Sequence, residues 1–498
     1  MHPLEAPSGC NSSEETEKHA HGIAVATKDV DTGAALVAGM SGDLDPDDAA
    51  RVLKKIDLGI LPMMCSEIQF MDKATLGSAA ILGIDDNIRL GTVFYLSYLL
   101  FEYPQNLALQ RFPVGRWMSI NIFVWGIALA CHAACTNFAG LFVARFVLGI
   151  CEGSVTAGFM IVSSMFYTRS EQTSRVGYWS QIISGFISFG SLHITTTGFA
   201  PWQWLMIITG SLTLIIAVVY WFFFPDSPTN AWFLTPAERA VAIRRLKENK
   251  HFKKDQMLEA LKDPKTWIFA LFSALDQIPN SLTNQRQIIV TSFGFSDLQT
   301  TLLSCVDGFV EVATIWTGVT IVSRIPNSRA YVGAVYFIPA LVGVFMIELL
   351  PWSNQVALLF AIWLVDIGIT GFVLSLAWLT SITAGHTKRV TRNAIMLSAY
   401  CVGNALGPFM WQTQYKPRNR VPWVVIGLCY LICPLLLLVI RFMLSRENKK
   451  RDAEPVNDTF EDVYIEQITA DGKRIEVKVD KEFLDLTDIQ NRDFRYVL

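Results

Sequence analysis

Twelve apolar stretches, each long enough to cross a lipid bilayer, stand in two groups of six around one charged loop. A helix needs about 20 mostly apolar residues to span the hydrocarbon core. The predicted spans are residues 57–80, 90–109, 117–135, 138–161, 175–197 and 203–224, then 266–289, 299–321, 331–350, 356–382, 392–412 and 423–444. The pattern predicts an all-α membrane protein with twelve transmembrane helices in two six-helix bundles.

The composition and the placement of charge agree with this class. Only 17% of the residues are charged, whereas a soluble protein has about 25%. The net charge of −3 carries little information, because Lys and Arg gather in alternate loops, above all between residues 239 and 265. The positive-inside rule places these loops and both tails in the cytoplasm. We expect a monomer in the lipid bilayer of the plasma membrane, with no nucleic-acid partner.

The spans divide the chain into five segments. They are a disordered cytoplasmic tail (1–50), an N-terminal bundle (51–224), a cytoplasmic inter-bundle loop (225–265), a C-terminal bundle (266–444) and a cytoplasmic C-terminal tail (445–498). The loop contains a sequence typical of a helix start. Thr235 would be the N-cap, Pro236 the first helical residue and Glu238 the capping-box partner. The amphipathic run over 239–250 would then lie either against lipid headgroups or in solvent.

Several classes of site are not supported by the sequence. No P-loop is present, so uphill transport would draw on an ion gradient, and no nucleophile or zinc-protease signature indicates an enzyme. Cys131/Cys135 and Cys429/Cys433 stand four residues apart inside apolar spans, with His132 beside the first pair. No second cluster completes four ligands, so packing is favoured over a metal site. We expect neither a metal nor a cofactor.

Charged residues inside the spans need a reason, because a charge at mid-bilayer is costly. Asp72 and Lys73 fall in span one, and Arg145 and Glu152 fall two helical turns apart on one face of span four, with Gly149 leaving room between them. Lys73 and Arg145 are predicted to bind a substrate carboxylate. Asp72 and Glu152 are predicted to carry the coupling proton. A substrate anion that binds Lys73 or Arg145 would release the neighbouring carboxylate, which could then accept a proton. A structural ion pair between Arg145 and Glu152 is the alternative.

Three further residues are candidates for contact with substrate. Gln69 precedes Asp72 on span one and would line the same face. Tyr98 and Trp378 belong to a set of aromatic residues suited to stacking on a flat substrate, although helix packing explains such residues at least as well. The stretch from Glu102 to Asn106 at the end of span two is predicted to be a gate or a packing element.

The second half contains acidic residues with no assigned role. Asp276 lies in span seven, Asp307 and Glu311 share one face of span eight, and Asp366 lies in span ten. They are candidates for a second proton site. Pro279-Asn280 in span seven predicts a break in that helix.

Short stretches distributed over most of the chain carry a family resemblance. They are Leu53–Asp57, Phe70–Lys73, Glu102–Asn106, Gln110–Arg116, Ala144–Gly149 with Glu152, Pro225–Pro228, Phe233–Thr235, Asp485–Asp488 and Phe494–Tyr496. The chain resembles the fungal allantoate permease group, within the anion:cation symporters of the major facilitator superfamily. The resemblance implies proton-coupled import of a small organic anion, such as a ureide, a nicotinate-like vitamin or a small peptide. It also implies that Asp72, Lys73, Arg145 and Glu152 serve substrate and proton.

The chain departs from the superfamily pattern between spans two and three. The superfamily's loop motif has Gly first and Asp fifth, where this chain has Asn106 and Gln110, and Gly115-Arg116 is displaced by two positions. Asn106, Arg111 and Arg116 are the gating candidates, but the usual gating salt bridges do not transfer directly.

Two other functions are compatible with the same pattern. An exporter of a fungal secondary metabolite would use the same fold in proton antiport. A nutrient sensor without net flux would need a long cytoplasmic signalling domain, for which the tail at 445–498 is short. The sequence does not specify the substrate.

Overall fold

The computed structural model describes residues 23–25, 46–65, 87–135, 137–167, 201–246, 253–454, 463–468, 474–479 and 486–498. Predicted span five and most of span one lie outside the described residues. So do three of the predicted site residues, Gln69, Asp72 and Lys73.

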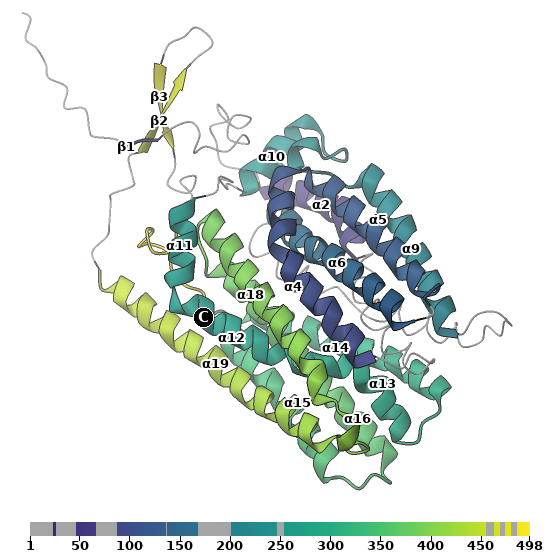
Figure 1. Cartoon of the computed structure of the whole chain (residues 1–498). Helices are drawn as coiled ribbons and strands as arrows, with labels where there is room; N and C mark the ends of the chain where they lie inside the picture. Colours follow the sequence, from purple (N-terminus) through teal and green to yellow (C-terminus); the bar gives the residue numbers. More distant parts are fainter. Residues whose placement is uncertain are drawn as a thin grey trace, which may run out of the picture.

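The first half consists of long helices whose apolar faces pack on one another. They are α2 (Pro46–Cys65), α4 (Asn87–Arg111), α5 (Val114–His132), α6 (Phe138–Phe166) and α9 (Pro201–Phe223). In Figure 1, α5 runs beside α9 and α4 beside α6, and the contacts between these helices agree with that view. Met118, Leu148 and Phe159 are buried in their common core.

The second half is a similar bundle in which two spans are interrupted. Its helices are α12 (Pro264–Gln277), α13 (Leu282–Ser292), α14 (Asp297–Arg324), α15 (Arg329–Leu349), α16 (Gln355–Asp366), α17 (Ile369–Ser381), α18 (His386–Leu406) and α19 (Arg420–Asp452), with the short 3-10 helices η3 (Pro279–Ser281), η4 (Gly407–Met410) and η5 (Thr413–Tyr415). Span seven breaks at η3, which confirms the break predicted at Pro279. Span ten divides between α16 and α17. There the backbone N–H groups of Ile367 and Gly368 donate to carbonyl oxygens three residues earlier, as in a 3-10 helix, instead of four.

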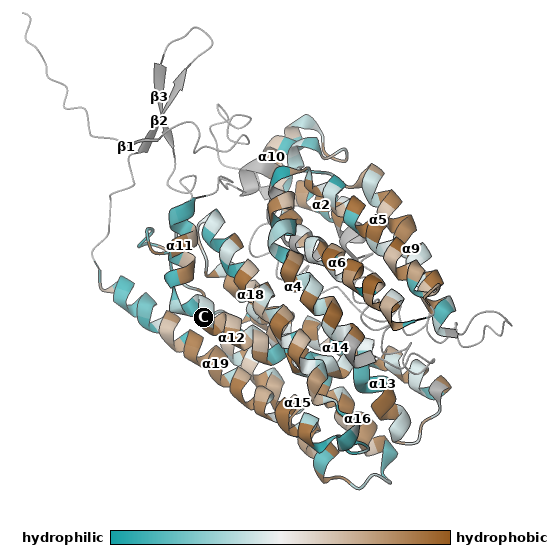
Figure 2. Cartoon of the chain, viewed as in Figure 1, coloured by the Kyte–Doolittle hydropathy of each residue, from teal (hydrophilic) through white to brown (hydrophobic). Residues whose placement is uncertain are grey.

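The apolar character of these helices suits a membrane. Among the residues that the structure describes, seven helices are long and apolar enough to cross one. Figure 2 shows hydrophobic residues along the middle of α5, α9, α15 and α19, whereas the end of α19 that carries Lys449, Lys450 and Arg451 is hydrophilic. The helix therefore continues to Asp452, eight residues past the end of the predicted membrane span at residue 444.

The segments outside the bundles contain more regular structure than predicted. The loop holds η2 (Pro228–Asn230), α10 (Pro236–Leu246) and α11 (Lys254–Lys262), and strands β1 (Ile23–Val25), β2 (Val463–Ile468) and β3 (Arg474–Val479) form a small sheet. In that sheet β1 pairs parallel to β2, and β3 pairs antiparallel to β2. Within the tail for which disorder is predicted over 1–50, the described residues form β1 and the start of α2. Pro46 and the acidic Asp47 and Asp48 favour a helix start there.

The predicted helix start in the inter-bundle loop is confirmed. The Thr235 backbone N–H donates to Glu238 Oε2 at 3.0 Å, and the Glu238 N–H donates to Thr235 Oγ1 at 3.4 Å. These reciprocal bonds form the capping box of α10. Lys55 Nζ of α2 donates to Glu238 Oε1 at 2.7 Å, which fixes α10 against the first half.

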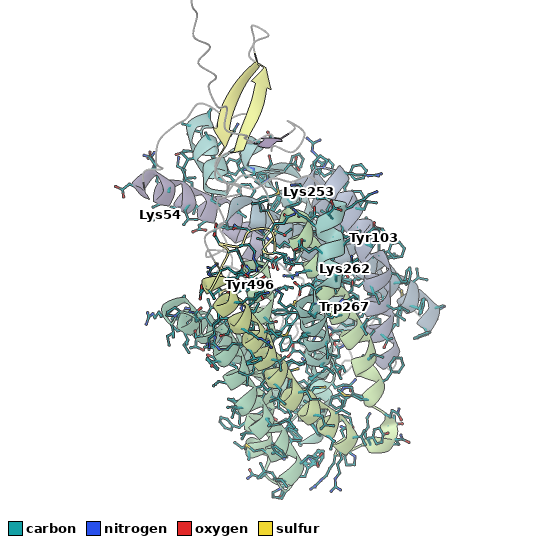
Figure 3. All side chains as sticks on the ribbon, turned by 90° about the vertical axis from the view of Figure 1, so that its left-hand side faces the viewer. Lys54, Tyr103, Lys253, Lys262, Trp267 and Tyr496 are labelled. Atoms are coloured by element: carbon teal, nitrogen blue, oxygen red, sulfur yellow. The ribbon has the colours of Figure 1, made fainter. Side chains whose placement is uncertain are left out.

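The last residues of the chain are docked against the second half. Asp488 is fully buried, and its Oδ1 lies 2.6 Å from Lys388 Nζ of α18, which is itself fully buried. Tyr496 donates its hydroxyl to Asp488 Oδ2 at 2.7 Å and accepts from Arg451 of α19 at 2.9 Å. Figure 1 places the C-terminus between α11, α12 and α19, and Figure 3 labels Tyr496 beside the end of α19. The last part of the predicted tail, residues 486–498, is thus folded against the second half.

We expect Asp488→Asn to lower the free energy of unfolding by about 3 kcal/mol at neutral pH, because it removes one partner of a buried ion pair. Burial alone would raise the pKa of Asp488, but Arg392, Lys388 and the Tyr496 hydroxyl outweigh it and hold that pKa below its ordinary value. The contribution is therefore complete above the unfolded pKa of about 3.9 and disappears as pH falls through the lower folded value.

Thermal unfolding of the detergent-solubilised protein across pH measures this contribution. The gap in melting temperature between wild type and variant should be constant above about pH 5 and should shrink below about pH 4. Equal melting temperatures at neutral pH would contradict the assignment.

Candidate functional site

A polar cavity lies in the second half, beside both helix interruptions. The volume of the cavity is about 50 Å³. Its wall comprises Asp276, Gln277, Pro279, Asn280, Leu282, Thr283, Arg286, Glu311, Val365, Asp366, Ile369 and Tyr430. Discontinuous helices near the bilayer midplane are typical of substrate and ion sites in transporters, because unwound backbone there can face a water-filled cavity.

Arg286 is the charged centre of this cavity. It stands one turn into α13, and its Nη1 lies 3.4 Å from Asp307 Oδ2 of α14. Its Nη2 donates to Asp366 Oδ1 at the end of α16. The side chains of Arg286, Asp307 and Asp366 are 12%, 10% and 9% exposed, so the guanidinium joins three helices in the interior of the bundle.

Two more carboxyl groups face the same space. Glu311 stands one turn after Asp307 on α14, is 8% exposed and lines the cavity. The ion pairs and hydrogen bonds of Arg286 go to Asp307 and Asp366, and none of those found among the described residues reaches the Glu311 carboxylate. Asp276, at the end of α12, accepts a hydrogen bond from Gln277 Nε2 at 3.0 Å.

An amide network holds the break in span seven. Asn404 of α18 donates to Gln277 Oε1 at 3.1 Å and accepts from Asn280 Nδ2 at 2.7 Å. Thr283 Oγ1 donates to Asn280 Oδ1 at 3.3 Å. These bonds fix side chains on both sides of η3 to α18, so one wall of the cavity has a defined shape.

In the first half, Arg145 and Glu152 are buried in α6 at 3% and 0% exposure. The space expected at Gly149 is occupied, which corrects the sequence interpretation. A Cβ at Gly149 would lie 2.1 Å from Ser97 Oγ and 2.3 Å from the Phe94 carbonyl oxygen. Gly149 is therefore required by the close approach of α4 to α6. It does not open a passage between Arg145 and Glu152.

Helix α4 also forms a contact between the two halves. Tyr98 is 1% exposed, and its ring centroid lies 6.5 Å from that of Tyr400 on α18. Ser398 donates to Glu102 Oε2 at 3.3 Å across the same interface. Tyr98 is thus at the junction of the halves, outside the wall of the polar cavity.

The position of Trp378 corrects its prediction as a substrate-stacking residue and agrees with the alternative, helix packing. Its indole Nε1–H donates to the Val497 carbonyl oxygen at 2.8 Å, and its ring packs edge-on against Phe269 at 5.6 Å. The ring is 1% exposed and covered by the C-terminal segment, so it packs the end of the bundle that carries this segment and does not line the polar cavity.

The gating candidates lie at the turn between α4 and α5. Asn106 is half-buried, and the side chains of Arg111 and Arg116 are exposed and form no ion pair among the described residues. The backbone N–H groups of Gly115 and Arg116 donate to Asp226 Oδ1 at 3.0 and 3.3 Å. Asp226 thus links the start of α5 to the inter-bundle loop. A Cβ at position 115 would lie 2.9 Å from that oxygen, so only glycine fits.

Arg286 is the main residue that the sequence reasoning missed. The signal was present, because an arginine within predicted span seven is as costly in lipid as Arg145 in span four. Its neighbours Asn284, Gln285 and Gln287 are polar, so this part of the span resembles a helix end more than an interior site.

Comparison with known proteins identifies the fold family. The family model described as Major Facilitator Superfamily matches residues 59–408. The chain belongs to the Major Facilitator Superfamily. It is 34% identical to the thiamine pathway transporter of Saccharomyces cerevisiae, over 90% of this chain and 86% of that one. It is 29% identical to the allantoate permease of the same yeast, over 92% and 88%.

A solved structure supports the same fold. A bacterial homolog of the human lysosomal transporter Spinster, in its inward-facing and occupied conformation, superposes with a TM-score of 0.53 at 14% identity, over 81% of this chain and 98% of that one. The expected major facilitator fold and the resemblance to fungal permeases are confirmed. The chain is a multi-pass membrane protein and a secondary transporter of this superfamily, not an enzyme.

The Arg286 cluster makes a prediction for stability. Arg286→Ala would leave Asp307 and Asp366 buried without a counter-charge, and we expect a loss of about 3–5 kcal/mol in the free energy of unfolding. Arg286→Lys keeps the charge and should cost less. Adding Asp366→Ala to Arg286→Ala should restore part of the loss, because the two side chains interact directly. Thermal unfolding in detergent measures all four proteins, and a wild-type melting temperature for Arg286→Ala would refute the ion-pair assignment.

Proposed function

We propose that this transporter imports a small organic anion together with protons across the plasma membrane, with both tails in the cytoplasm. The observation that carries the proposal is the placement of buried cations inside both bundles. Arg145 is 3% exposed in α6, and the Arg286 side chain is 12% exposed in α13. In a membrane protein, buried ionisable residues that face the bundle interior mark substrate and proton pathways. Allantoate, named in one relative, is itself a carboxylate.

The proposed chemistry in the first half is a competition for the cations. Arg145 and Lys73 bind the substrate carboxylate, with Gln69 beside them, and Glu152 and Asp72 take up the coupling proton. While an arginine pairs with a nearby carboxylate, that carboxylate resists protonation. A substrate anion that engages the arginine releases the carboxylate, which then accepts a proton. Loading of anion and proton is thereby coupled, as symport requires.

The proposed motion is a rocking of one bundle against the other. The contact of Tyr98 with Tyr400 and the bond from Ser398 to Glu102 link the halves along α4 and α18. Both helices otherwise pack within their own bundles, α4 on α6 and α18 on α12. Alternating access in this superfamily moves such halves around a site near the midplane. The exposed Arg111 and Arg116 at the α4–α5 turn are the proposed gate residues.

Uptake of labelled allantoate, nicotinate and glycylglycine, in cells that lack their own carriers, tests the proposal. Uptake of at least one acid should be faster at acidic than at neutral external pH and should stop when a protonophore is added. Arg145→Gln should lower it roughly tenfold or more, since a buried charge loses its partner, whereas Arg145→Lys should retain part of it. Glu152→Gln should weaken the response to pH.

Three outcomes would contradict parts of the proposal. Uptake that persists with the protonophore would remove proton coupling. Full activity of Arg145→Gln would remove the role of this cation. Expression that protects cells from a toxic acid, instead of sensitising them, would indicate an exporter.

A further inference from the structure

The polar cavity of the second half holds an excess of acidic groups. Asp276, Glu311 and Asp366 line it, and Asp307 lies behind Arg286. Arg286 is the one basic residue among the described residues of the wall. Four carboxyl groups and a single guanidinium therefore lie in or beside this cavity, where buried charge needs compensation.

The wall also holds carboxylate oxygens that have no hydrogen-bond partner among the described residues, together with one unpaired donor, Arg286 Nε. The Glu311 carboxylate is buried, faces the cavity and has no hydrogen-bond partner in the described part of the chain. Asp366 uses Oδ1 for Arg286, whereas its Oδ2 accepts no hydrogen bond there. Asp276 receives one bond, from Gln277. These three carboxyl groups come from three helices, α14, α16 and α12, and converge on one space.

We infer that this cavity receives a positively charged nitrogen of the substrate, so that the transported acid is a zwitterion. The inference rests on the proposed function and extends it to the class of substrate. A primary ammonium group has three N–H donors and one positive charge, which match the spare acceptors and the excess charge. The carboxylate of the same molecule is bound by the cations of the first half, so both halves hold the substrate.

The size of the cavity agrees with an ammonium group. A cavity volume of about 50 Å³ admits a charged nitrogen with the atoms next to it, but not a whole metabolite. The rest of the molecule must extend out of the cavity. Protons or a sodium ion would also neutralise the excess charge, but neither would make affinity depend on an amino group in the substrate. That dependence is what distinguishes the alternatives.

The test uses full-length protein purified in detergent and three pairs of acids that differ in one amino group. The pairs are alanine and propionate, 4-aminobutyrate and butyrate, and glycylglycine and N-acetylglycine. Affinities come from titrating the melting temperature. In wild type, the amino member of at least one pair should bind roughly tenfold more tightly than its partner. Glu311→Gln should abolish that preference and leave the affinity for the deaminated acid unchanged.

One control variant and a second cavity variant complete the test. Glu348→Gln is the matched variant, because Glu348 lies on α15 outside the cavity and faces Arg420 at 3.9 Å. It should behave as wild type. Asp276→Asn provides a second cavity variant if Glu311→Gln unfolds, and it should also weaken the preference.

Equal affinities within every pair, or a preference that both cavity variants retain, would overturn the inference and leave the proposed function standing. A Glu311→Gln variant that alters only the pH dependence of uptake would show that the cavity serves protons, and would overturn it too. If none of the six acids binds but allantoate or nicotinate raises the melting temperature, the inference fails and the proposed function stands.

Discussion

The absence of water from the bilayer core is the constraint on which the rest of this structure depends. Each polar group there must find its partner inside the protein. Apolar side chains therefore cover the helix surfaces along α5, α9, α15 and α19, while charged residues gather in the interiors of the two halves. The helix interruptions obey the same constraint. Those of spans seven and ten both lie at the polar cavity, where amides, Arg286 and carboxylates replace solvent.

The ends of the bundles show how this interior is held in place. At one end of the second bundle, the last residues of the chain bury Asp488 against Lys388, and Tyr496 ties that carboxylate to Arg451 of α19. Between the halves, α4 contacts α18 through Tyr98 and Glu102. The second bundle is thus closed by strong polar bonds at one end, whereas few polar bonds between described residues join it to the first. Such a difference suits a carrier whose halves must move against each other.

The sequence predicted the elements that depend on local chemistry. Apolar length indicated the spans, Pro279 the break in span seven, and Thr235 with Glu238 the start of α10. It did not reveal contacts made by distant segments. Spacing placed Gly149 between Arg145 and Glu152, but could not show that α4 fills that space. Nor could it show that the C-terminal segment covers Trp378, or that span ten is interrupted at Ile367 and Gly368 without a proline.

The central claim is that the buried charges of this transporter face a water-filled pathway and not lipid. Reaction of single added cysteines with a membrane-impermeant maleimide, counted above the wild-type background, tests it most directly. Thr283→Cys, in the cavity wall beside Arg286, should be labelled, and substrate should protect it. Phe309→Cys, on the outer face of α14, should not be labelled in the membrane. Absence of labelling at position 283 from either side of the membrane would contradict the account.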